Sequence, residues 1–287
     1  MSGAFELILD AGCQLGESPV WCVQRELLLF VDITGRRLLK FNPASRALES
    51  CAIEEDIGCV APSGGGGFVA GLRSGIWLLN EKGEKQRMLA ANPEGSRVSR
   101  FNDGRVDCAG RFLAGTVDEA KAGGGAALYR YDRRGLIRLT DGLITSNGLA
   151  FSPDGYTLYH SDTPRFTVYR YDYDASSGAA EDRRVFVELK PTASDRGRPD
   201  GAAVDAQGCY WTALYEGARV QRYDPQGRLM SEHAVPVQNP TMPAFGGSDL
   251  KTLFVTTARD AAGSGGGLYA AEVDVPGLAT FVFDPTV

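Results

Sequence analysis

Four oxygen-bearing side chains stand at or beside the start of strand-rich segments that recur along the chain. They are far apart in the sequence: Glu17, Asn102, Asn147 and Asp200. In a circular repeat fold the equivalent starts of the repeats meet around one axis, so these side chains would face one another. Carboxylate and amide oxygens are the donors that hard divalent cations prefer. The sequence therefore predicts a cation site assembled from distant segments, without a local metal-binding motif.

The segments that must position these residues are short apolar runs separated by turn residues, and helical periodicity is scarce. Tyr-Arg-Tyr-Asp occurs at 129–132 and at 169–172, and Gln-Arg-Tyr-Asp occurs at 221–224. The shared tyrosines are 40 and 52 residues apart, and periods of about 40–50 residues with several strands each are typical of propeller blades. Six such units fill the chain. We therefore expect an all-β fold, a six-bladed β-propeller of four-stranded antiparallel blades around a central channel, as a single domain over residues 1–287.

A ring of blades must be closed where its two ends meet. We expect the N-terminal strand, near residues 5–8, to pair into the last blade beside a C-terminal run at residues 280–283. Residues 175–183 are expected to form an exposed loop.

Composition argues against several classes of function. The net charge of −6 lacks the basic footprint of a nucleic-acid-binding protein. No apolar run approaches the ~20 residues that cross a membrane, and residues 1–6 lack the basic and apolar regions of a secretory signal. The six cysteines are scattered without a Cys-x-x-Cys pair, which predicts reduced, mostly packed thiols in a cytoplasmic protein. The sequence indicates no obligate protein partner.

Other catalytic motifs find little support. Gly65-Gly66-Gly67-Phe68-Val69-Ala70 loosely fits a dinucleotide fingerprint, but a β-like run follows where the fingerprint needs a helix. The two histidines, His160 and His233, allow a Ser-His-Asp triad only by count, and His160 is better interpreted as a hydrogen-bonded structural residue. So few histidines also argue against a nitrogen- or sulfur-rich zinc site. Any metal should therefore be held by oxygen donors.

Four motifs in a fixed order carry a family resemblance: Leu15-Gly-Glu-Ser-Pro-Val-Trp21, Arg100-Phe-Asn-Asp-Gly104, Asn147-Gly-Leu-Ala-Phe-Ser-Pro-Asp-Gly155 and Pro199-Asp-Gly201. Together they resemble the SMP-30/gluconolactonase/LRE-like (regucalcin-like) family over about residues 15–259. The resemblance implies a six-bladed propeller that binds one divalent cation through three protein ligands, Glu17, Asn147 and Asp200. The cation would be Ca²⁺ or Zn²⁺ first, with Mn²⁺, Mg²⁺ or Fe²⁺ as further options.

The resemblance also implies residues that contact a substrate. Arg100 and Asn102 correspond to positions that meet the hydroxyl and ring oxygens of a sugar, and Asn102 would lie close to the metal through water. A further acidic contact falls on Glu119 or, in a register one residue away, on Asp118.

The chemistry of this set can be argued independently. A dication between Glu17 and Asp200 would offset the repulsion of two confined carboxylates. It would also polarise a lactone carbonyl and lower the pKa of bound water. Asp200 is then the candidate general base, and Arg100 would help hold a polyhydroxylated ring in the attack geometry.

The main hypothesis is metal-dependent hydrolysis of a sugar lactone to its aldonic acid, with gluconolactone as the default substrate. The alternatives are a phosphotriesterase or esterase on the same propeller, a calcium-binding regulator without significant turnover, and a protein-interaction platform. Taken singly, Asp200-Gly201 could be a turn former and Asn147-Gly148 a hairpin turn. Taken together, at one end of a repeat ring, these residues favour a site.

Overall fold

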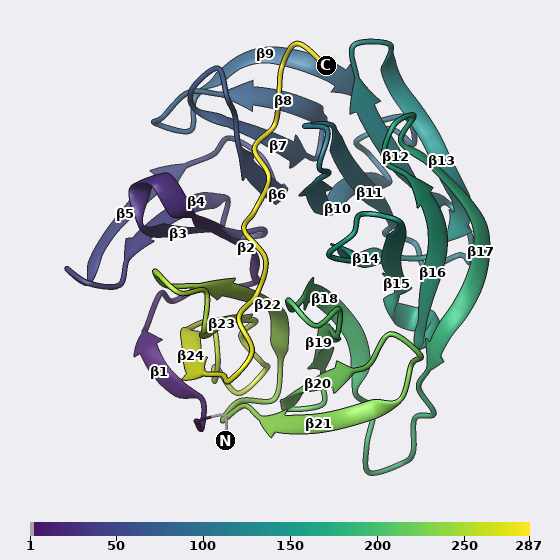
Figure 1. Cartoon of the computed structure of the whole chain (residues 1–287). Helices are drawn as coiled ribbons and strands as arrows, with labels where there is room; N and C mark the ends of the chain where they lie inside the picture. The colour runs from purple at the N-terminus through teal and green to yellow at the C-terminus, as the bar shows by residue number, and fades with distance from the viewer. Residues whose placement is uncertain (1–2) are drawn as a thin grey trace.

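Six antiparallel sheets of four strands each form a ring in the computed structural model, which describes residues 3–287 (Figure 1). The strands follow the apolar runs, and the Gly- and Asp-rich steps between the runs form the turns. From the inner to the outer strand, blade 1 is β2 (Gly16–Cys22), β3 (Leu27–Asp32), β4 (Arg37–Asn42) and β5 (Ala47–Ala52); blade 2 is β6 (Ile57–Pro62), β7 (Phe68–Leu72), β8 (Gly75–Leu79) and β9 (Lys85–Ala91); blade 3 is β10 (Ser99–Val106), β11 (Phe112–Asp118), β12 (Ala126–Asp132) and β13 (Gly135–Leu143); blade 4 is β14 (Ser146–Phe151), β15 (Thr157–Asp162), β16 (Thr167–Asp174) and β17 (Ala179–Glu188); blade 5 is β18 (Arg198–Val204), β19 (Tyr210–Tyr215), β20 (Arg219–Tyr223) and β21 (Leu229–Ala234); blade 6 is β22 (Pro240–Gly246), β23 (Thr252–Thr257), β24 (Leu268–Glu272) and β1 (Glu6–Leu9). The predicted six-bladed propeller is confirmed.

The hydrophobic core lies between blades. One cluster joins Leu29 and Val31 of blade 1 to Ile57, Val60 and Phe68 of blade 2. The outermost strands, such as β5 and β9, are mostly exposed. A single blade would therefore leave its apolar faces in water, and stacking against both neighbours buries them.

The ring closes in the last blade as predicted, but without the C-terminal run. Strand β1 pairs antiparallel with β24, with Glu6 opposite Ala270. The expectation that residues 280–283 lie beside this strand is wrong, because β1 already fills the fourth position of blade 6. The C-terminal segment instead crosses one face of the ring (yellow in Figure 1), where the Phe283 amide donates to the Pro62 carbonyl over 2.9 Å. Phe283 is buried there against Phe112, which gives its ring more burial than a sheet edge would.

The loop predicted at residues 175–183 is only half right. The chain turns at 175–178, where the Asp174 carboxylate accepts hydrogen bonds from Ser176 and Ser177. From Ala179 onward the chain is β17, paired with β16. The reason is that this local turn needs only four residues, so the remainder can extend the outer strand.

The structure also bears on the smaller expectations. The two helices in residues 3–287 are single 3₁₀ turns, Val23–Arg25 and Thr163–Arg165, and neither has the length or apolarity to cross a membrane. All six cysteines are free and five are buried, with Cys108 exposed, so the prediction of mostly packed thiols is confirmed, and their reduced state stays a prediction. His160 is buried and contacts Ser146 Oγ at 2.7 Å, the structural role predicted for it. The cytoplasmic location stays a prediction.

Candidate metal centre and active site

A break in strand register aims the site residues at the axis. The innermost strand of every blade shifts register against its neighbour near its start. Such bulges bend a strand and redirect its side chains. Glu17 and Asn147 begin two of these shifts, and Asn102 and Asp200 lie within two others. The glycine at 148, with φ +62°, is required, because a Cβ there would meet Tyr210 Oη at 2.5 Å.

A chain of hydrogen bonds links side chains from three neighbouring blades. Arg100 Nη1 donates to Asn102 Oδ1 over 2.6 Å, and Asn102 Nδ2 donates to Asn147 Oδ1 over 2.8 Å. Asn147 Nδ2 donates in turn to Asp200 Oδ1 and to Thr163 Oγ1, the latter over 2.9 Å. These bonds fix the orientation of both amides, so their oxygens and the Asp200 carboxylate hold defined positions.

Among the residues that the structure describes, two buried carboxylates in this arrangement form no salt bridge. Glu17 and Asp200 are 7% and 6% exposed, and within residues 3–287 neither forms a salt bridge with a lysine or arginine. Burial, Asp200 and Asp103 raise the pKa of Glu17 well above its usual value. Burial and Asp103 likewise raise the pKa of Asp200. Paired like charges in a dry site are costly, and a bound dication would remove that cost.

The donor set fits a hard cation. The part of the chain that the structure describes has no group of three His, Cys, Asp or Glu side chains placed to bind a metal. A cation at the axis would therefore be held by the carboxylates of Glu17 and Asp200 together with the amide oxygen of Asn147. Oxygen-only donors suit Ca²⁺, Mg²⁺ or Mn²⁺ better than a soft metal.

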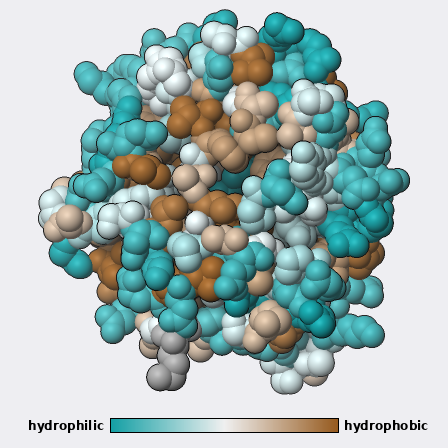
Figure 2. Space-filling model, in the orientation of Figure 1, coloured by the Kyte–Doolittle hydropathy of each residue, from teal (hydrophilic) through white to brown (hydrophobic). Residues whose placement is uncertain are grey.

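These residues line a cavity of about 450 Å³, which is within the usual range for small-molecule sites. It is lined by Leu15, Glu17, Ile33, Arg100, Asn102, Lys121, Ile144, Thr145, Asn147, Thr163, Pro164, Arg198, Asp200 and Tyr215. On β10, β14 and β18 the lining comes from the first residues of the strand. The last residues of the same strands line a cavity of only about 70 Å³ at the other end of the channel, under residues 278–281. Apolar residues gather over the middle of that face (Figure 2).

The structure brings together five of the six residues predicted for the site: Glu17, Arg100, Asn102, Asn147 and Asp200. Glu119 lies outside this lining, because both its carboxylate oxygens accept from Arg73, over 2.6 and 2.9 Å. Its alternative, Asp118, accepts from backbone amides of the following turn, including Gly123. A substrate contact by either carboxylate stays a prediction.

Sequence reasoning missed several residues at the site. Asp103 was not among the predicted site residues, yet it is buried on β10, accepts from the Leu149 amide over 2.8 Å and acts on both site carboxylates. Lys121 and Arg198 line the cavity without having been singled out. Two of these residues lie next to predicted site residues in the sequence: Asp103 follows Asn102 directly, and Arg198 precedes Asp200 by two residues.

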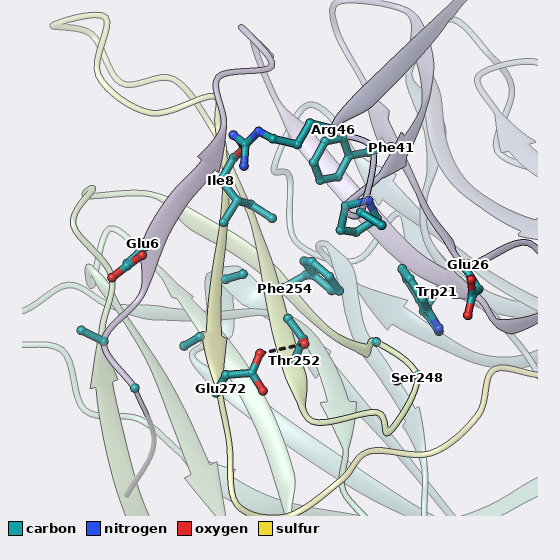
Figure 3. A pocket seen from close by; sticks show the side chains of 17 residues that line it. Glu6, Ile8, Trp21, Glu26, Phe41, Arg46, Ser248, Thr252, Phe254 and Glu272 are labelled. Atoms are coloured by element: carbon teal, nitrogen blue, oxygen red, sulfur yellow. Dashed lines mark hydrogen bonds between the residues drawn. The ribbon is translucent and has the colours of Figure 1, made fainter.

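A larger cavity, of about 600 Å³, lies elsewhere, along the seam between blades 6 and 1. Trp21, Phe41 and Phe254 form its aromatic wall, and the Trp21 and Phe254 rings stack with centroids 5.9 Å apart (Figure 3). Its one arginine, Arg46, donates to the Ile8 carbonyl. It contains none of the converging amides and carboxylates, so the axial cavity is the better candidate for catalysis.

Comparison with known proteins agrees with the family and the residue range predicted from the motifs. Residues 15–259 match the family described as SMP-30/gluconolactonase/LRE-like region. The chain is 42% identical to 6-deoxy-6-sulfogluconolactonase of Pseudomonas putida over 99% of both chains, and 36% identical to regucalcin of Xenopus laevis over 89% of this chain and 87% of that protein. A solved structure of a calcium-binding protein, regucalcin from Agrobacterium tumefaciens, matches with a TM-score of 0.91 at 25% identity, covering 98% of this chain and 97% of that one. Because the family match spans most of the chain and these relatives align nearly end to end, the protein belongs to the SMP-30/gluconolactonase/LRE-like family.

Proposed function

We propose that this protein is a metal-dependent lactonase that hydrolyses a sugar-derived lactone to the aldonic acid. The observation that carries the proposal is the convergence of Glu17, Asn147 and Asp200, from three blades, in one cavity where, within residues 3–287, neither buried carboxylate forms a salt bridge. The lactonase named among the relatives supports the reaction class, a hydrolase acting on carboxylic ester bonds. Because that relative is named for a sulfonated gluconolactone, charged as well as neutral sugar lactones belong in the tests.

Glu17, Asn147 and Asp200 would hold the cation. When bound, it supplies Lewis-acid polarisation of the lactone carbonyl and a lowered pKa for nearby water. Calcium is the first candidate, because oxygen donors suit it and one structural relative is described as calcium-binding. Zinc, manganese, magnesium and iron are the other metals to test.

Asp200 would act as the general base. Asn147 holds one of its carboxylate oxygens, so the other can accept a proton from the attacking water. The new bond joins the water oxygen to the carbonyl carbon, and the bond that breaks joins that carbon to the ring oxygen. Asp200 then returns the proton to the leaving ring oxygen. The product is an open-chain acid.

The hydrogen bonds divide the roles of Arg100 and Asn102. Both amide hydrogens of Asn102 are engaged, by the carbonyl of Ser146 and by Asn147, so this residue chiefly positions Asn147. Within residues 3–287, both hydrogen bonds that the Arg100 side chain donates use Nη1. Its Nη2 and Nε therefore remain to donate to hydroxyl or ring oxygens of a sugar.

The test is lactone hydrolysis in a pH-stat, with protein stripped by a chelator and then reloaded with each metal. We expect activity to vanish on stripping and to return with one cation, and Asp200→Asn to lower kcat by about 10²–10⁴-fold. Activity that resists the chelator, or full activity in the variant, would refute the proposal. A second candidate, a calcium-binding regulator, is favoured by the regucalcin relatives. It predicts tight calcium binding with negligible turnover on every lactone.

A further inference from the structure

Three cationic side chains from two blades and a loop line the axial cavity. Arg100 lies on β10, Lys121 follows β11, and Arg198 opens β18. They lie close enough to act on one another: the pKa of Lys121 is lowered, first by burial and then by Arg100 and Arg198. The fold therefore gathers like charges at the mouth of a confined site, which is unfavourable unless an anion joins them.

The hydrogen-bonding capacity of these cations is largely unused within residues 3–287. Lys121 Nζ makes one hydrogen bond, of 2.8 Å, to Thr145 Oγ1, although an ammonium group has three donors. Arg198 Nη2 pairs with Glu216 over 3.1 Å, and its guanidinium lies over the Tyr215 ring, but its buried Nε has no hydrogen-bond partner. An external acceptor in the cavity would find unused donors on Lys121 Nζ, with the Arg198 guanidinium in the same lining.

The charge balance gives the sign of that acceptor. Arg100, Lys121 and Arg198 line the cavity with the carboxylates of Glu17 and Asp200, while Asp103 lies close to those carboxylates and Glu216 pairs with Arg198. A dication held by Glu17 and Asp200 would offset these carboxylates, so the cationic side chains would then attract an anion. A lactone with an ionised substituent meets that condition, and a neutral lactone does not.

Lys121 and Arg198 are both tied to segments that carry residues proposed to hold the cation. Thr145, which accepts a hydrogen bond from Lys121, precedes Asn147 by two residues, and Arg198 precedes Asp200 by two. A lactone whose carbonyl lay at the cation would therefore have its far end in the cavity that these two cationic side chains also line.

We propose that Lys121 and Arg198 form an anion-binding subsite, and that the substrate is a sugar lactone with a sulfonate, phosphate or carboxylate on the carbon farthest from the carbonyl. This inference rests on the proposed function. A planar guanidinium and an ammonium group together can donate to two or three oxygens of such a group.

The first experiment compares lactones that differ only at the far carbon. It measures kcat/KM for neutral gluconolactone and for its 6-deoxy-6-sulfo, 6-phospho and 6-carboxylate counterparts. We expect one of the anionic lactones to exceed gluconolactone by at least about 100-fold, and raising the ionic strength to reduce that ratio. The order among the three identifies the acidic group. A ratio near one for all three, in an enzyme that hydrolyses gluconolactone, would overturn the subsite and leave the lactonase proposal intact.

The second experiment uses variants and a readout that needs no turnover. We expect Lys121→Met and Arg198→Met each to lower the anionic-to-neutral kcat/KM ratio by at least about 10-fold, and the exposed control Lys82→Met to leave it unchanged. Calorimetry then compares two products, gluconate and 6-deoxy-6-sulfogluconate. The sulfonated acid should bind the wild type at least about 10-fold more tightly, and Lys121→Met should abolish the difference. Equal binding of the two acids by the wild type would overturn the subsite. Tighter sulfonate binding without any lactone hydrolysis would keep the subsite and refute the lactonase.

Discussion

Replacing Asp200 by asparagine should make the metal-free protein more stable and the metal-loaded protein less stable. The amide retains an oxygen that can accept from Asn147 Nδ2, so that hydrogen bond is kept. What the substitution removes is one of two buried carboxylates, Asp200 and Glu17, that act on each other and that form no salt bridge within residues 3–287. Removing a buried like charge while keeping shape and hydrogen bonding relieves the metal-free fold.

The size of the effect follows from proton linkage. Burial and Asp103 raise the pKa of Asp200 in the folded protein above its unfolded value. When the pKa of a carboxyl group is higher in the folded than in the unfolded protein, the group does not affect stability at a pH below both values. As the pH rises above the unfolded-state pKa toward the folded-state pKa, the group destabilises the fold increasingly. Each unit of such a rise corresponds to about 1.4 kcal/mol. Asp200→Asn should therefore stabilise the metal-free protein at pH 7.5 by at least about 1.4 kcal/mol, which is about 3–6 °C in Tm for a domain of this size.

Bound metal should reverse which of the two proteins, wild type or Asp200→Asn, is the more stable. A cation at 100 times its Kd stabilises the wild type by about 2.7 kcal/mol, and the variant, which lacks one ligand, should gain far less. Scanning calorimetry with chelator and with excess calcium measures both orders. Asp172→Asn is the matched control, because the exposed Asp172 pairs only with Arg184 at the surface and should shift stability by less than about 1 kcal/mol. A chelated Asp200→Asn protein that melts below the chelated wild type would refute the reasoning.

Three further predictions test other parts of the structure. Arg100→Lys should raise KM for the lactone about tenfold, because the fork of donors is lost, while the metal-induced shift in Tm persists; loss of that shift would mean that Arg100 supports the metal ligands. Phe283→Ala should cost about 3 kcal/mol in urea unfolding, because the ring is buried against Phe112, and a loss under 1 kcal/mol would show that the C-terminal segment contributes little. Burial lowers the pKa of His160 to about 3, so the free energy of unfolding should be about 2 kcal/mol smaller at pH 5 than above pH 6.5. His160→Gln should flatten this part of the plot of unfolding free energy against pH. If the slope of that plot is the same in the variant, His160 is not its cause.

The sequence was sufficient for the ring and for most of the site, because both depend on local patterns. Blade repeats follow from strand and turn periodicity, and Asn147 and Asp200 stand where each inner strand begins. The path of the C-terminal segment could not be predicted in this way. It depends on whether the Phe283 ring is better buried between blades 2 and 3 or at a sheet edge, and this comparison requires the packed structure.

The same limit explains the cations that were missed. Lys121 and Arg198 are ordinary loop and strand residues until the fold places them beside Arg100. Glu119 shows the reverse case: its position beside a motif indicated substrate binding, and Arg73, 46 residues away, engages its carboxylate instead. Long-range ion pairs of this kind leave no local signal.

The propeller separates the residues that stabilise it from those that can do chemistry. The apolar clusters between blades contain none of the cavity's charged residues. Below the site, half-buried Arg105 donates to the carbonyls of Leu149, over 3.1 Å, and Ala202, over 2.6 Å, and so ties three inner strands together beside the carboxylate of Asp103. Inter-blade packing and this tether can hold the inner strands in place even while the carboxylates above them repel each other. The axis can therefore remain unfavourable without a cation, and that condition favours tight binding of one.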